Sequence, residues 1–369
     1  MLRQHGRHSA RTLLLALVLA GTTPFTAPAQ TAARQSEVRL PDRLSDAEFW
    51  ALVDSISEPG GYFQIQDNFT SNEREIGQIF TMLRDRKVSG NVYMGVGPEQ
   101  NLTYIAAIRP KMAFIVDIRR QAVMQHLMFK AIFEMAPDRA DFISILFSKP
   151  RPPGIDSSTT IQNVWDAFWH MQSDSALWRA NYARITDLLT KTHGFRITQP
   201  EMEQLKWVFD AFFMYGPIIT TRSGSGGGGG SQSTFADLTG YSNDESGTPR
   251  SFLSTEENYA YVKDLHARNL VVPVSGDFAG PKAIRSIGAW LKSHGGIVSA
   301  FYVSNVEQYL VRESKAGLFY DNVATLPIND ESVFIRPYSL RRFGFGATPL
   351  CAIGPFLETS RTSTVMCPR

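Results

Sequence analysis

Two glycines and an aspartate, Gly95, Gly97 and Asp117, have the types and the spacing that could bind a sugar-bearing ligand. Glycines at a strand-to-helix turn let the backbone approach a ligand closely, and the helix that follows offers unpaired N–H groups. Asp117 comes 22 residues after Gly95, at the end of the next apolar run, where a carboxylate can accept hydrogen bonds from ribose hydroxyls. Purely structural turns are the alternative. We predict a nucleotide-type pocket near residues 95–117.

The residues that complete this loop, Glu99, Gln100 and Asn101, narrow the kind of ligand. An anionic Glu99 would repel a phosphate, so the loop suits a sulfonium or an amine better than the pyrophosphate of a dinucleotide. The third glycine of the dinucleotide fingerprint would fall at Gln100, which also disfavours an NAD enzyme. The predicted pocket has two requirements: Asp117 must not be held in a buried salt bridge, and side chains must not fill the turn.

Polar residues on either side of the loop extend the predicted site. Asn72 and Glu73 could reach over the glycine loop to hold a polar end of the ligand, whereas Ser71 or Thr70 could simply cap the helix that follows. Asn305 follows an apolar run, at the kind of strand end where α/β sheets place ligands. A structural helix cap is an equal alternative for Asn305.

Other catalytic patterns are absent from the sequence. It contains no G-x-S-x-G elbow, no H-E-x-x-H motif and no Walker loop. It also has no C-x-x-C and no paired Cys/His spacing, so we predict no metal site.

The residues of the predicted site must be held in place by strands and helices. Strand and helix patterns alternate along the sequence, and this alternation predicts an α/β fold. Crossover units of this length make parallel sheets with helices on both faces, so we expect a doubly wound, mostly parallel, Rossmann-like sheet. Ser45 and Glu48 should form a capping box at the start of the first helix. The expected strands are 91–94, 112–117, 270–274, 297–303 and 333–336, and the expected helices include 45–56, 72–86, 255–268 and 282–293.

Residues 148–250 interrupt this alternation with prolines and aromatic-rich helical stretches, which predict a helical insertion. Its aromatic side chains form either its own core or a cap over the pocket. A glycine-rich stretch at 223–233 has the composition of a flexible linker. The predicted organisation is a signal peptide at 1–29, the first part of the Rossmann-like domain at 30–147, the insertion at 148–250, and the second part with a C-terminal tail at 251–369.

The first residues have the features of a secretory signal. Arg3, Arg7 and Arg11 precede an apolar stretch at 12–21, and the run 27–29 reads Ala-Pro-Ala, as at a cleavage site. An uncleaved membrane anchor is the alternative, but about ten apolar residues fall short of the ~20 that span a bilayer. We expect an exported protein, periplasmic or secreted. Export would permit a disulfide between Cys351 and Cys367, although two free thiols are the simpler alternative.

The composition is that of a globular protein. Of 369 residues, 43% are hydrophobic and 20% are charged, which is too polar for a chain with many membrane spans. The net charge of +2 comes without long basic runs, so neither nucleic acid nor an anionic membrane is an expected main partner. We expect a soluble mature protein with no stable membrane insertion and a small molecule as its partner.

The glycine loop at 92–97 and the strand end at 114–118 resemble the class I S-adenosylmethionine-dependent methyltransferase fold. The resemblance extends to Gly276 and Asp277 and to the paired glycines at 295–296, and it covers about half of the mature chain. The sequence is also similar to a group of uncharacterised exported bacterial proteins that carry such a domain. The resemblance implies that Gly95 and Gly97 lie against the methionine part of S-adenosylmethionine, that Asp117 binds the ribose, and that Asp277 lies near the adenine.

The loop departs from the methyltransferase pattern at Tyr93, where an acidic residue is usual, and at Glu99, where a third glycine is usual. Export also separates the protein from S-adenosylmethionine, which is made in the cytoplasm. We therefore expect an exported methyltransferase-like protein that binds a small adenosine-like or amine-bearing ligand and could transfer a methyl group. The alternative is a non-catalytic cell-envelope binding or interaction protein with a vestigial pocket.

Overall fold

The computed structural model describes residues 39–73, 75–88, 90–223, 232–336 and 349–360. The expected signal segment, the glycine run at 226–230 and Cys367 lie outside these residues. The described residues belong to one compact unit.

A six-stranded sheet in the order β3-β2-β1-β4-β5-β6 forms the centre of this unit. All neighbouring strands are parallel except β5 and β6, which pair antiparallel. The expected α/β fold with a mostly parallel sheet is therefore confirmed. The strands are β1 (Val92–Gly95), β2 (Met112–Asp117), β3 (Val271–Ser275), β4 (Val298–Tyr302), β5 (Val333–Ile335) and β6 (Leu350–Ala352).

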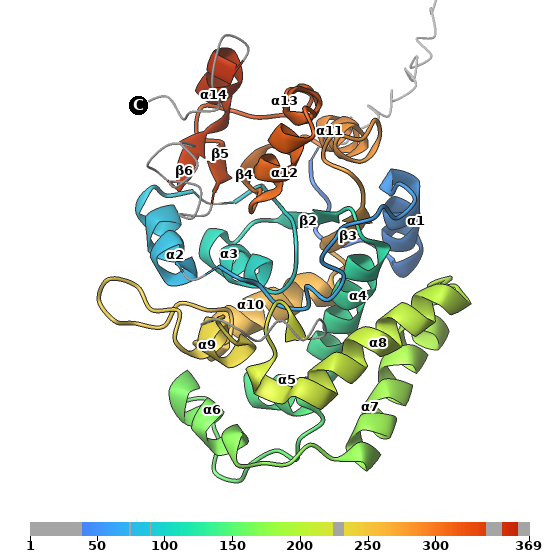
Figure 1. Cartoon of the computed structure of the whole chain (residues 1–369), viewed down its shortest axis with the longest axis vertical. Coiled ribbons are helices and arrows are strands. Elements are labelled where there is room, and N and C mark those ends of the chain that lie inside the picture. Colours follow the sequence, from blue (N-terminus) through green and yellow to red (C-terminus); the bar gives the residue numbers. More distant parts are fainter. Residues whose placement is uncertain (1–38, 74, 89, 224–231, 337–348, 361–369) are drawn as a thin grey trace, which may run out of the picture. The chain divides into compact units, whose positions relative to one another are not determined.

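The described residues contain fourteen α-helices, and the helices around the sheet form two groups (Figure 1). Contacts join α2, α3, α4 and α10 in one group and α1, α11, α12 and α13 in the other. The helices of these groups are α1 (Asp46–Ile56), α2 (Ile76–Asp85), α3 (Gln100–Ile108), α4 (Arg120–Met135), α10 (Glu256–Ala267), α11 (Ala283–Ser293), α12 (Val306–Arg312) and α13 (Ala316–Val323).

The remaining helices are α5 (Arg139–Phe147), α6 (Ile161–Trp169), α7 (Ser175–Asp187), α8 (Gln199–Tyr215), α9 (Phe235–Gly240) and α14 (Ile353–Ser360), with a π-helical turn at Leu188–Thr192 and a 3₁₀ turn at Gly216–Ile218. Helix α4 contacts β2 and β3 and also α8, so it joins the sheet to the helices that follow (Figure 1). The rings of Phe147, Trp165 and Phe235 pack together, as do those of Trp178 and Tyr182. Many of the aromatic side chains in this region thus pack against one another.

Local sequence signals explain where several elements begin. The strand β2 is buried at every position, as expected for an apolar run covered on both faces. The Ser45–Glu48 capping box is confirmed: Ser45 Oγ accepts from Glu48 N at 3.3 Å, and Glu48 accepts from Ser45 N at 2.8 Å. The expected helix at 72–86 begins later, at Ile76. Ser71 Oγ instead accepts from Glu73 N at 3.1 Å, so Ser71 stabilises the preceding turn and does not cap α2.

Candidate functional site

A pocket of about 440 Å³ lies where the chain leaves β1, β2, β3 and β4. Its other walls come from the segment between α1 and α2 and from α12. Strands β1 and β4 are neighbours in the sheet. From β1 the chain continues to β2 on one side, and from β4 it continues to β5 on the other side. In open α/β sheets, ligands bind outside the carboxyl ends of the strands at such a switch point. The pocket therefore lies where this architecture places ligands.

The predicted site residues divide into two sets. One set lines the pocket: Asn72, Gly97, Gln100, Asp117, Asp277 and Asn305. The other set lies behind it: Glu73, Gly95, Glu99 and Asn101 do not belong to the lining. The carboxylates of Asp117 and Asp277 thus belong to one cavity, and Glu99 does not.

The glycine turn is filled by side chains, which contradicts the recess expected at Gly95. Asn101 Nδ2 donates to the carbonyls of Val96 (3.0 Å), Gly97 (3.0 Å) and Pro98 (2.8 Å), and Tyr93 Oη donates to Asn101 Oδ1 at 2.8 Å. A Cβ on Gly95 would lie 2.0 Å from Asn101 Oδ1. Gly95 is therefore needed for this internal packing, and Asn101 supports the loop rather than facing a ligand.

Gly97 and His126 hold the part of the loop that does face the pocket. Gly97 has a φ of +81°, a conformation that disfavours any side chain. Its carbonyl lies 2.9 Å from His126 Nε2 of helix α4. Burial lowers the pKa of His126, so the ring is neutral and donates this hydrogen bond.

Glu99 does not lie beside the ligand space, contrary to the expectation that it would face a sulfonium. Its carboxylate is 1% exposed and accepts from Thr70 Oγ1 at 2.6 Å and from Ser71 N at 3.0 Å. Burial raises the pKa of Glu99 to about 7. Glu99 therefore fastens the segment between α1 and α2, which forms one wall of the pocket.

Asp117 is held in a buried salt bridge. Its predicted role in binding a ribose required that no such salt bridge be present. Its Oδ1 accepts from Arg119 N (2.9 Å) and Nε (3.0 Å), and its Oδ2 accepts from Arg119 Nη2 (2.8 Å). The side chains of Asp117 and Arg119 are 6% and 4% exposed. Because a carboxylate accepts about four hydrogen bonds, roughly one position of Asp117 is left for a ligand. Arg119 Nη1 has no hydrogen-bond partner among the described residues, so this strand end also carries an unused donor.

Asp277 and Asn305 lie in the pocket wall with their side chains available. Asp277 Oδ1 accepts from Ala279 N at 2.9 Å, and Asp277 forms no ion pair with other described residues. Asn305 precedes α12 at the N-cap position, but its side chain makes no cap hydrogen bond. The structural alternative for Asn305, a side-chain helix cap, is therefore not observed.

The lining has little net charge apart from Asp277. Arg119 neutralises Asp117, and Lys315 lies 2.7 Å from Glu313. The carboxylate of Asp277 thus forms no ion pair within the described residues, although Lys315 of the lining lies near enough to interact with it electrostatically. A negative group in a pocket walled partly by protein favours a cationic part of a ligand.

Sequence reasoning missed the aromatic wall of the pocket. Phe63 and Tyr309 both line it, and their rings meet edge to face at 5.1 Å. The guanidinium of Arg119 lies 6.0 Å from the Phe63 ring. Phe63 lies in an irregular segment without helical or strand periodicity, so no pattern in the sequence placed it near Tyr309. Aromatic faces of this kind can bind a base or a cation.

Two further findings concern metal ions and membranes. Within the part of the chain that the structure describes, no group of three or more His, Cys, Asp and Glu side chains could hold a metal ion. No helix of the described ranges is long and apolar enough to cross a membrane.

The chain belongs to a protein family described as a domain of unknown function, DUF7790, whose model matches residues 68–189 and 234–351. The matched residues include all the strands of the sheet except the end of β6, and most of the pocket lining. No curated protein matches the sequence significantly. The family description assigns no activity.

Proposed function

We propose that this protein binds a small adenosine-like or amine-bearing molecule in the pocket at the carboxyl ends of β1 to β4. The observation that carries the proposal is the position of the 440 Å³ cavity at the switch point between β1 and β4. Its volume is within the range of small-molecule sites. Asp277 would face a cationic group, and the rings of Phe63 and Tyr309 would contact a base or the cation.

S-adenosylmethionine is the first candidate within this class, and methyl transfer is the reaction that it would supply. The sequence resemblance to methyltransferases supports this candidate, as does a strand order that is compatible with a Rossmann-like sheet. The ligand would contact Gly97 and Gln100 from the loop, Asn72 from the overlying segment, and Asp277 and Asn305 from the later strand ends. Asp117 would offer at most one hydrogen bond to a ribose.

A non-catalytic binding protein of the cell envelope is the second candidate. The buried Asp117–Arg119 salt bridge and the filled glycine turn favour it, because both reduce the contacts that a methyltransferase would make with its cofactor. In this case the pocket would hold a different amine-bearing molecule or have lost its ligand.

Calorimetry with S-adenosylmethionine, S-adenosylhomocysteine and adenosine tests the proposal. We expect saturable binding to the wild-type protein and a loss of at least about tenfold in affinity, or roughly 1.4 kcal/mol, in Asn72→Trp, since an indole at this exposed lining position would occupy the pocket. Asn163→Trp is the matched control, because Asn163 is an exposed residue of α6 outside the lining. Binding that is equal in all three proteins would place the ligand elsewhere, and no binding would favour the second candidate.

A further inference from the structure

Glu73 is a buried carboxylate directly behind the pocket wall. It is 6% exposed, and its Oε1 accepts hydrogen bonds from Tyr302 Oη at 2.9 Å and from Ser304 Oγ at 3.3 Å. Tyr302 is the last residue of β4, and both Tyr302 and Ser304 line the pocket. The two residues whose hydroxyls bond to this carboxylate thus belong to the pocket lining.

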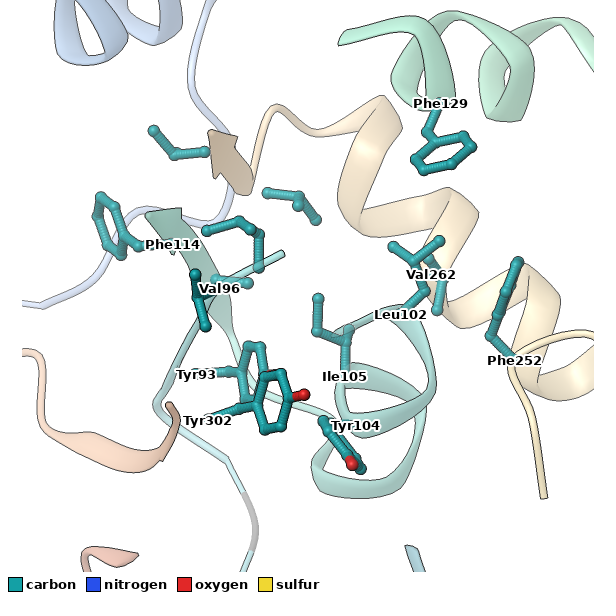
Figure 2. Close-up of a cluster of buried hydrophobic side chains, with 14 of the residues drawn as sticks. Tyr93, Val96, Leu102, Tyr104, Ile105, Phe114, Phe129, Phe252, Val262 and Tyr302 are labelled. Carbon is teal, nitrogen blue, oxygen red and sulfur yellow. The ribbon is translucent and has the colours of Figure 1, made fainter. Parts of the chain in front are cut away.

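The surroundings of Glu73 oppose its negative charge. No cationic side chain among the described residues pairs with it, and the nearby charged group is another carboxylate, Glu75. The ring of Tyr104 packs at 5.1 Å from that of Tyr302 (Figure 2), and the buried Tyr104 hydroxyl has no hydrogen-bond partner within the described ranges. Burial raises the pKa of Glu73 to about 7, so both protonation states are populated near neutral pH.

We propose that Glu73, acting through the hydroxyl of Tyr302, accepts a proton from a hydroxyl or protonated amine group of the bound molecule. This inference rests on the proposed function, because it requires a ligand in the pocket. The O–H of a ligand hydroxyl, or the N–H of a ligand ammonium group, would transfer its proton to Tyr302 Oη while Tyr302 passes its own proton to the Glu73 carboxylate. The Tyr302 hydroxyl is regenerated, Glu73 becomes a neutral carboxylic acid, and the ligand's oxygen or nitrogen keeps the electron pair as a nucleophile.

The chemistry of the two groups suits a relay. Burial holds the pKa of Tyr302 well above its usual value, so Tyr302 transfers a proton in passing and does not persist as a phenolate. A carboxyl group with a pKa near the working pH is an effective general base. Ser304 Oγ supplies a second hydrogen bond that keeps the carboxylate oriented. Glu73 is therefore a positioning and proton-accepting residue that does not itself touch the ligand.

The first test needs no ligand. In ¹³C NMR of protein labelled at glutamate carboxyl groups, the resonance that Glu73→Gln removes should titrate near pH 7. In Tyr302→Phe its midpoint should rise by roughly half a unit or more, because the hydroxyl that favours the carboxylate is lost. Glu134→Gln is the control: Glu134 of α4 is a partly buried carboxylate, but it bonds to Lys130 and His193, lies outside the pocket lining and should leave the Glu73 midpoint unchanged.

The second test uses S-adenosylhomocysteine as the probe, titrated by calorimetry at pH 7 in two buffers of different ionisation enthalpy. Filling the pocket removes water from the Tyr302 side and raises the pKa of Glu73 further, so the wild type should take up as much as about half a proton per ligand. Glu73→Gln should bind without this uptake and Tyr302→Phe with less of it, whereas Glu134→Gln should retain it in full.

The relay would be overturned if proton uptake persists in Glu73→Gln. It would also be overturned if the titration midpoint of Glu73 is the same in Tyr302→Phe as in the wild type. Absence of binding to the wild-type protein would instead overturn the proposed function and, with it, the ligand's part in the relay. The coupling between Glu73 and Tyr302 would then be decided by the NMR titration alone.

Discussion

Asp117 and Arg119 show how one neighbouring side chain changes the role of a predicted site residue. The pair is almost fully buried. The guanidinium of Arg119 satisfies two acceptor positions of the carboxylate, and the backbone N–H of Arg119 satisfies a third. Such a pair gains little net stability over apolar residues of similar volume, because both ions lose their hydration. The pair lies at the end of β2 in the pocket wall, where it leaves Asp117 roughly one acceptor position for a ligand.

Removal of one partner should therefore be far more costly than removal of both. We expect Arg119→Met to lower the free energy of unfolding by about 3–5 kcal/mol, because it leaves Asp117 buried without its cation. The double variant Asp117→Leu/Arg119→Met should regain most of this loss. Urea denaturation of the three proteins measures the difference. A single variant that costs under about 1 kcal/mol would show that solvent reaches Asp117.

At the scale of elements, the segment between α1 and α2 is fastened at both ends. Near its start, the Glu58 carboxylate accepts from the backbone N–H groups of Asp277 (3.1 Å), Lys282 (2.8 Å) and Ala283 (2.9 Å), where α11 begins. A carboxylate at a helix N-terminus is favoured by the helix dipole. Near its end, the segment is held by Glu99. The protein thus uses two of its own carboxylates to place Phe63 and Asn72 against the pocket.

A second set of charges joins α1, α4 and the π-helical turn. His193 Nε2 lies 2.8 Å from Glu134 Oε2, and His193 Nδ1 lies 2.9 Å from Asp46 Oδ2. Lys130 Nζ lies 2.5 Å from Glu134 Oε1. Burial alone would lower the pKa of His193, but its contacts with Glu134 and Asp46 outweigh burial, and the pKa is raised. The pKa values of Glu134 and Asp46 are lowered by the same contacts, against the opposing effect of their burial.

This network should make stability depend on pH in a defined window. The contribution of His193 is complete below its ordinary pKa of 6.5 and is lost as the pH rises through its raised value in the folded protein. The contributions of Glu134 and Asp46 are complete above their ordinary values of 4.5 and 3.8 and are lost as the pH falls through their lowered values. The stabilisation should therefore be greatest at about pH 5–6.

Denaturation of the wild type and of His193→Gln between pH 3 and 9 tests this dependence. The difference in unfolding free energy should peak at about pH 5–6 and shrink toward both ends. His294→Gln is a control, since His294 bonds within its own helix end, to the Trp290 carbonyl and to Ser293. A difference that stays constant across this range would mean that His193 contributes by packing rather than by charge.

At the scale of the whole molecule, we propose that the protein is exported to an oxidising compartment. Cys351, in the edge strand β6, is disulfide-bonded, and the sequence's other cysteine, Cys367, lies outside the described residues. Disulfides persist in oxidising compartments and are rare in the cytosol. This bond and the signal-like start of the sequence together support an exported, periplasmic or secreted protein.

Expression of the full sequence in a Gram-negative host tests export. We expect the protein in the periplasm or medium, with an N-terminus near Gln30 and no thiol that reacts with a labelling reagent before reduction. A chain without residues 1–29 is the control and should stay in the cytoplasm with labelled thiols. Reduction of the exported protein should lower the free energy of unfolding by about 2–4 kcal/mol. A full-length cytoplasmic product would contradict the signal assignment.

Local signals in the sequence predicted five of the six described strands and one side of the pocket, but not the antiparallel strand β6. Continuous apolar runs predicted β1 to β5 to within a residue or two, because strands covered on both faces exclude polar side chains. The Ser45–Glu48 capping box was predictable because its bonds join residues three positions apart. The carboxyl ends of parallel strands meet at one sheet edge, so Gly97, Asp117, Asp277 and Asn305 could be grouped in advance.

Tertiary structure alone decided which of these side chains face the cavity. Glu99 and Glu73 turn toward Ser71 and Tyr302, and Phe63 reaches Tyr309 across 246 positions of the chain. The physical reason is that a side chain's partner is set by packing between distant segments, which leaves no periodic trace in the sequence. Strand positions and the edge of the sheet that carries the cavity follow from local pattern. Strand order, and the charge and hydrogen bonding inside the cavity, depend on contacts that only folding creates.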